Sequence, residues 1–165
     1  MIGEAEAGLT EYTFVLKLND RPGTMELIAA TFAHRGLSIT GTLGHDGTHD
    51  PGGHATVVLQ FRAIEARKEA MKSTLARLSR VVSVHEPDSG DTNIRRCAIF
   101  RLAASAAEPS LPSAESGVVQ RVATDDATGE ITYAVMGPAS DIEHLLDSMR
   151  ASGDLRGVTH AVLAL

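Results

Sequence analysis

The first half of the chain alternates between two hydrophobic patterns, one with a period of two residues and one with a period of about 3.6 residues. The two-residue alternation predicts strands at residues 12–18, 37–43, 55–61 and 81–85. Apolar residues spaced three and four apart predict helices at residues 22–34 and 64–78. The first half therefore has the order strand, helix, strand, strand, helix, strand.

The second half repeats this order with one weakened element. Alternating apolar residues predict strands at residues 96–103, 118–123, 130–136 and 158–163. Pro109 and Pro112 interrupt residues 104–117, where the first helix of the repeat is expected. At most a short helix near residues 112–116 is therefore predicted.

The last helix carries the clearest start and stop signals. Ile142, Leu145 and Met149 fall on one helical face. Ser140 and Glu143 have the spacing of a capping box at its start. Ser152 and Gly153 are expected to end the helix before the final strand.

Both halves thus predict an α+β fold in which each half is a βαββαβ unit with an antiparallel four-stranded sheet and helices on one face. We expect the two domains to span residues 10–88 and 94–165. The second domain is expected to lack most of its first helix.

One turn, which we call the opening turn, consists of residues 19–24 and joins the first strand to the first helix. Gly23 allows a ligand to approach the backbone closely, and Pro22 favours a helix start. The amides of Gly23, Thr24 and Met25 are expected to point out of the helix N-terminus, where a carboxylate is stabilised. This pattern predicts a small-molecule binding site, although its residue types would also make a good turn without any ligand.

Composition and charge narrow the possible functions. The chain has 165 residues, 43% of them hydrophobic, and a net charge of −6, which argues against nucleic-acid binding. No apolar run approaches the roughly 20 residues that span a membrane, and the N-terminus does not resemble a signal peptide. We therefore expect a cytoplasmic protein. The lone Cys97 lies in an apolar run and is expected to be a buried, inert thiol.

The loop at residues 44–54 contains several side chains that can bind a metal, namely His45, Asp46, His49, Asp50 and His54. A flexible loop of this composition could surround a zinc or nickel ion. Gly47 and the Pro51–Gly53 run prevent a regular helical spacing of ligands. A solvated loop without metal is therefore the favoured interpretation.

The chain contains no recognisable catalytic motif. It lacks the G-x-S-x-G pattern of serine hydrolases and the glycine patterns of nucleotide-binding enzymes. The basic residues of the second helix are expected to form an exposed face, with Glu65 and Glu69 between them. A small enzyme that uses His85 or His160 in a sheet cleft remains an alternative.

The opening turn and its flanks resemble the ACT domain, a ferredoxin-like regulatory module that binds amino acids. The matching residues are Leu18, Asn19, Pro22, Gly23, Met25, Ile28, Phe32 and the run at residues 35–39. From Tyr12 onward, nearly the whole chain resembles the small regulatory subunit of acetohydroxyacid synthase, also called acetolactate synthase. The junction between the halves (residues 81–84 and 95–102) and the end of the chain (residues 133–137 and 141–146) extend this resemblance.

The resemblance implies two tandem ACT domains and a homodimer or higher oligomer, with an amino acid bound between two chains. One chain would contribute Asn19, Asp20, Gly23, Thr24 and Met25, and its neighbour would contribute Ser38 and Ile39. Met25 and Ile39 suit a small branched side chain such as that of valine. The family commonly has an asparagine at the position of Ser38.

The resemblance also implies a non-catalytic protein without a cofactor of its own. Its partner would be the catalytic subunit of the synthase, which holds thiamine diphosphate and is subject to feedback inhibition. The second half resembles the part that contacts this partner. An alternative is a stand-alone amino-acid sensor with two ACT domains, similar to the glycine-cleavage repressor, which acts on transcription or on another enzyme.

Overall fold

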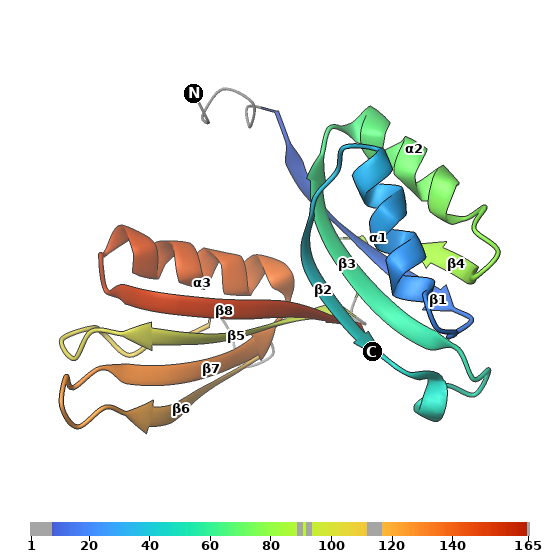
Figure 1. Cartoon of the computed structure of the whole chain (residues 1–165). Coiled ribbons are helices and arrows are strands. Elements are labelled where there is room, and N and C mark those ends of the chain that lie inside the picture. Colours follow the sequence, from blue (N-terminus) through green and yellow to red (C-terminus); the bar gives the residue numbers. More distant parts are fainter. Residues whose placement is uncertain (1–7, 89–90, 92–93, 112–116, 165) are drawn as a thin grey trace. The chain divides into compact units, whose positions relative to one another are not determined.

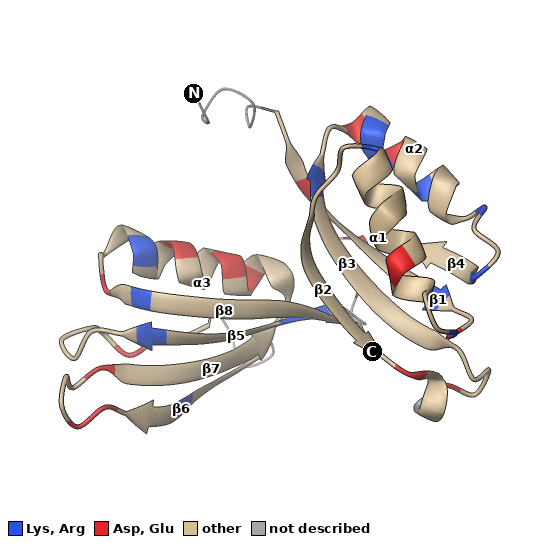
Figure 2. Cartoon of the chain, in the orientation of Figure 1, with Lys and Arg blue, Asp and Glu red and all other residues tan. Residues whose placement is uncertain are grey.

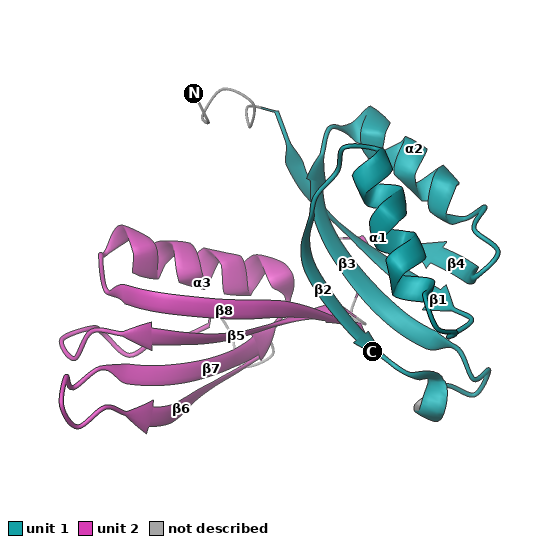
Figure 3. Ribbon diagram, viewed as in Figure 1, with its two compact units in different colours: residues 1–87 teal, residues 88–165 magenta. Residues whose placement is uncertain are grey.

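The computed structural model describes residues 8–88, 91, 94–111 and 117–164 (Figure 1). These residues form, in order, β1 (Thr10–Leu18), α1 (Thr24–His34), β2 (Ile39–His45), the short 3-10 helix η1 (Gly47–His49), β3 (Ala55–Ala63), α2 (Glu65–Leu75), β4 (Val81–His85), β5 (Ile94–Leu102), β6 (Val118–Thr124), β7 (Ile131–Gly137), α3 (Ala139–Ala151) and β8 (Leu155–Ala164). The chain divides into two compact units, residues 1–87 and residues 88–165 (Figure 3).

Each unit contains one antiparallel four-stranded sheet with the same topology. The strand orders are β2-β3-β1-β4 and β6-β7-β5-β8. In unit 1, α1 and α2 lie on one face of the sheet, and in unit 2 α3 covers one face of its sheet (Figure 1). The predicted pair of βαββαβ units is therefore confirmed. No helix lies between β5 and β6 among the described residues, and the short helix predicted at residues 112–116 falls outside them.

Phe61 on β3 is the centre of the unit 1 core. Its ring centroid lies 4.9 Å from that of Phe14 on β1 and 5.2 Å from that of Phe32 on α1, both in edge-to-face geometry. All three rings are at most 1% exposed. Such pairs contribute beyond the area that they bury, so this cluster fastens α1 to the two central strands.

The core of unit 2 is built from α3 and the central strands. Phe100 on β5 and Tyr133 on β7 stack at 5.8 Å between centroids. Ala106 and Leu111, from the irregular segment after β5, pack against this core. Cys97, which we expected to be buried, is only half-buried on β5.

The predicted capping box of α3 is wrong. The helix begins at Ala139 with Pro138 as its N-cap, so Ser140 lies inside the first turn. The Glu143 carboxylate instead lies 2.7 Å from the Nη1 atom of Arg96 on β5. Glu143, which the local pattern predicted to cap the start of α3, thus forms an ion pair with a residue of β5 instead. The predicted stop is confirmed, because Ser152 is the C-cap and Gly153 has a left-handed φ of 76°.

The prediction of an exposed basic face on α2 is wrong for Lys68, which is only 5% exposed. Its Nζ atom lies 2.8 Å from Glu65, 2.7 Å from Glu69 and 2.8 Å from Glu86. The hydrogen bonds that Lys68 donates to Glu65, then to Glu69 and Glu86, raise the pKa of Lys68. Figure 2 shows the mixed charges along α2. We call these four residues the Lys68 cluster.

The histidine-containing loop between β2 and β3 is organised by its acids. The Oδ1 atom of Asp50 lies 2.9 Å from Nζ of Lys17 on β1. The Oδ2 atom of Asp50 accepts hydrogen bonds from the amides of Gly52 at 2.9 Å and His54 at 3.2 Å. No group of three or more His, Cys, Asp or Glu side chains gathers as a metal site in the described part of the chain. None of the helices described is long and apolar enough to cross a membrane.

Truncating Phe61 should destabilise the protein strongly. For Phe61→Ala we expect the free energy of unfolding to fall by about 3–5 kcal/mol, because the cavity would open between three elements. Phe61→Leu, which fills more of the space, should cost less. Urea unfolding would measure both. The exposed control Val122→Ala should change stability by less than about 0.5 kcal/mol, and a Phe61→Ala loss no larger than the control's would contradict this account of the core.

Asp50 should make the stability of the protein depend on pH in acid. Its hydrogen bond from Lys17, followed by that from the His54 amide, lowers the pKa of Asp50 from 3.8 to about 2. As the pH falls, Asp50 therefore binds a proton in the unfolded chain before it does so in the folded protein. The stabilisation by Asp50 is fully present above the unfolded pKa of 3.8 and is lost as the pH falls towards 2. Urea unfolding at a series of pH values should show a shallower acid slope for Asp50→Asn. Asp126→Asn, at an exposed acid in the β6–β7 turn, should keep the wild-type slope; equal slopes in all three proteins would refute the role of Asp50.

Candidate ligand site at the start of the first helix

The opening turn depends on the backbone of Gly23. This residue is the N-cap of α1 and has a left-handed φ of 81°. Glycine adopts this conformation without the steric cost that a Cβ atom brings. The carbonyl of Gly23 accepts the first helical hydrogen bond, from the amide of Leu27 at 3.0 Å. The sequence therefore changes from strand to helix within a few residues.

Thr24 holds the opening turn from the inside and is only 3% exposed. Its hydroxyl donates to the carbonyl of Arg21 at 2.8 Å, and its amide donates to the same carbonyl at 3.0 Å. The amides of Gly23 and Met25 have no acceptor among the described residues. Two backbone donors at the helix N-terminus are thus available to an anion, whereas the amide of Thr24 is already used.

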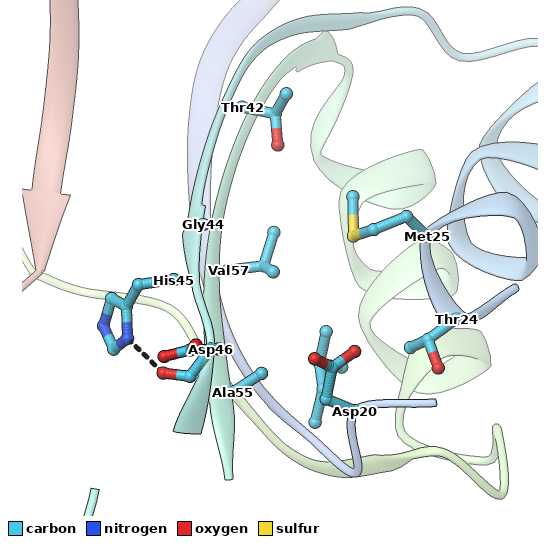
Figure 4. A pocket seen from close by; sticks show the side chains of 10 residues that line it. Asp20, Thr24, Met25, Thr42, Gly44, His45, Asp46, Ala55 and Val57 are labelled. Carbon is cyan, nitrogen blue, oxygen red and sulfur yellow. Dashed lines mark hydrogen bonds between the residues drawn. The ribbon is translucent and has the colours of Figure 1, made fainter. Parts of the chain in front are cut away.

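A pocket of about 290 Å³ lies beside this helix start, between α1 and the end of the sheet where β1 stops (Figure 4). It is bounded by the opening turn, by α1 and by strands β1, β2 and β3. The lining residues are Leu18, Asp20, Thr24, Met25, Thr42, Gly44, His45, Asp46, Ala55 and Val57.

The pocket has a polar end and an apolar side. Figure 4 shows Asp20, Thr42, Met25 and Val57 around one space, with the His45 ring pointing away from it. Asp20 brings a carboxylate beside the start of α1, and Thr42 brings a hydroxyl on the opposite side of the space (Figure 4). Val57 is 6% exposed and forms part of the floor, while Met25 is 42% exposed and lies at the mouth. A small ligand with both charges and a short apolar group would match these surfaces.

The structure brings together part of the predicted site. Asp20, Thr24 and Met25 line the pocket, and Gly23 lines a second hollow of about 400 Å³ that shares these three residues with the pocket. Asn19 lines neither hollow, and its amide donates to the carbonyl of Arg80 at 2.9 Å.

Ser38 and Ile39 do not line the pocket of their own chain. Ser38 is exposed, and Ile39 packs, partly buried, against the unit 1 core. Their contribution from a neighbouring chain therefore stays a prediction.

The opposite wall of the pocket was missed by reasoning from the sequence. Thr42 and Gly44 come from β2, and Val57, the partner of Gly44 in the strand register, comes from β3. A Cβ atom on Gly44 would lie 3.1 Å from a methyl group of Val57, so the glycine keeps this wall open. The signal available in the sequence was the alternation that places Thr42 and Gly44 on one face of a strand.

This chain is similar to known proteins in its structure. No family model and no curated protein matches the sequence. The structure is similar to the small subunit of acetolactate synthase from Thermotoga maritima, with a TM-score of 0.61 and 17% identity, covering 94% of this chain and 96% of that chain. Also similar is the regulatory subunit of aspartate kinase from Thermus thermophilus, with a TM-score of 0.45 and 16% identity, covering 90% of this chain and 98% of that chain.

At this level of identity the likeness concerns the fold, and function has to be argued from the site. The match to the small subunit extends over both units. The chain therefore has the fold of two tandem ferredoxin-like ACT domains and is similar in structure, over nearly its whole length, to the small subunit of acetolactate synthase from Thermotoga maritima.

Proposed function

We propose that this chain is a non-catalytic regulatory protein of the cytoplasm and that its first unit binds a small amino acid. The observation that carries the proposal is the pocket beside the start of α1, which brings a helix N-terminus, a carboxylate and an apolar side together. An amino acid carries a carboxylate, an ammonium group and a side chain, and each has a matching surface there.

The proposed binding mode follows from charge. The ligand carboxylate accepts hydrogen bonds from the amides of Gly23 and Met25 at the positive end of α1. The ammonium group pairs with the carboxylate of Asp20. The side chain lies against Val57 and Met25, which favours a small branched apolar group such as that of valine.

Binding becomes regulation when the ligand prefers one arrangement of the protein over another. We propose that a second copy of the chain closes the site with Ser38 and Ile39, so that the bound amino acid stabilises one form of a homodimer or higher oligomer. The exposed Ser38 at the start of β2 supports this proposal, because a neighbouring molecule can reach it.

The proposed target is the catalytic subunit of acetohydroxyacid synthase, which would hold the thiamine diphosphate and carry out the chemistry. The fold shared with the acetolactate synthase small subunit supports this choice. A second candidate is a stand-alone amino-acid sensor that acts on transcription or on another enzyme. Unit 2 favours this alternative, because its described residues lack a helix between β5 and β6. Its surface for a partner would then differ from that of a unit that has both helices.

Valine, leucine or isoleucine should stabilise the protein selectively among the twenty amino acids. A ligand at about 100 times its Kd adds about 2.7 kcal/mol, which raises the Tm of a chain of this size by roughly 5–10 °C. A thermal shift assay would measure this. Asp20→Asn should lose most of the rise, whereas Asp126→Asn should keep it. If no amino acid raises the Tm, or if Asp20→Asn responds like the wild type, the proposed site is wrong.

The chain should also bind a synthase catalytic subunit. We expect a purified catalytic subunit to be retained by the immobilised chain, and its activity to become sensitive to valine when the two are mixed. Retention without valine sensitivity would separate partner binding from effector binding. An amino-acid response in the free chain with no retention of the synthase would instead support the stand-alone sensor.

A further inference from the structure

We propose that Arg80, in the connection between α2 and β4, is a positioning residue that aims the Gly23 amide of the opening turn at the ligand carboxylate. This inference rests on the proposed function of the opening turn as an amino-acid site. It adds a determinant that lies 58 residues along the chain from Pro22.

Arg80 contacts the opening turn at both of its ends. Its backbone carbonyl accepts a hydrogen bond from the amide of Asn19 at 2.9 Å. Its Nη1 atom donates to the carbonyl of Pro22 at 2.8 Å and lies 3.4 Å from the hydroxyl of Thr24. One residue therefore fixes the beginning of the opening turn through its backbone and the end through its guanidinium group.

The contact to Pro22 determines where the Gly23 amide points. The carbonyl of Pro22 and the N–H of Gly23 belong to one planar trans peptide group, so they point in opposite directions. When Arg80 holds the carbonyl on its own side, the N–H of Gly23 is directed to the other side. The aim of this donor is thus set by a hydrogen bond to the preceding carbonyl.

Such an external restraint is needed because the hinge of the opening turn is a glycine. Gly23 has access to more backbone conformations than any other residue type, and it has no side chain that could lock the peptide plane. Thr24 restrains the helical side through Arg21. Arg80 restrains the Pro22–Gly23 peptide group, which no other side chain contacts through its carbonyl among the described residues.

Arg80 also places a positive charge beside the opening turn. Its Nη1 atom lies 3.5 Å from the point where a Cβ atom on Gly23 would stand. This charge adds to the positive end of α1 and favours ligands that carry a negative group. Arg80 should therefore contribute more to the binding of an amino acid than to that of its amide, which lacks the carboxylate.

The first test uses the protein without ligand. In ¹H–¹⁵N spectra of the full chain, Arg80→Met should shift the amide resonance of Gly23. It should also speed the hydrogen exchange of the Thr24 amide, which donates to the carbonyl of Arg21, at least several-fold. Arg80→Lys, which keeps the charge and most of the length, should restore part of the protection. Arg77→Met, at an exposed arginine nearby, should leave both amides unchanged. Wild-type shifts and exchange in Arg80→Met would overturn the proposal.

The second test compares valine with valinamide, which lacks the carboxylate. Arg80→Met should weaken valine binding about tenfold or more, since hydrogen bonds that involve a charged group are the stronger ones, and should weaken valinamide binding much less. Equal losses for both ligands would show a merely structural role and overturn the proposal. If the wild-type chain binds no amino acid, the proposed function fails, and the ligand-free spectra still decide whether Arg80 positions the turn.

Discussion

The left-handed backbone at Gly23 is the constraint on which the rest of unit 1 depends. It lets the chain leave the central strand β1 and begin α1 within a few residues, so that Phe32 on α1 can pack against Phe61 on β3. The same geometry leaves the amides of Gly23 and Met25 without acceptors among the described residues. The core and the candidate site thus have one origin, because a helix that starts this abruptly both covers the sheet and exposes its first donors.

The sequence was sufficient for the features that depend on neighbouring residues. Alternation of apolar side chains located the strands, and the Pro22–Gly23 pair located the start of α1. The sequence alone did not predict the features that form where distant segments meet. The far wall of the pocket depends on the pairing of Gly44 with Val57, and strand register is set by tertiary packing.

The capping box at Ser140 failed for a related reason. A local capping motif competes for its side chains with every tertiary partner that the fold brings near. Here Glu143 forms an ion pair with Arg96 and does not cap the helix. Lys68 shows the same competition in a helix that otherwise looks solvent-facing, since Glu86 reaches it from the end of β4. The contacts of the charged residues were therefore the hardest to predict from the sequence, because they depend on which opposite charges the fold places nearby.

The Lys68 cluster has a consequence for how this protein can change over generations. The buried ammonium group of Lys68 lies against three carboxylates, and Lys72 lies 2.9 Å from one of them, Glu86. Replacing Lys68 first would leave Glu65 and Glu69 without this ion-pair partner. Residues that share a network do not contribute independently. Drift at these positions is thus expected to follow an order, with the acids lost or exchanged before the lysine. Related chains should carry the four residues as a correlated set.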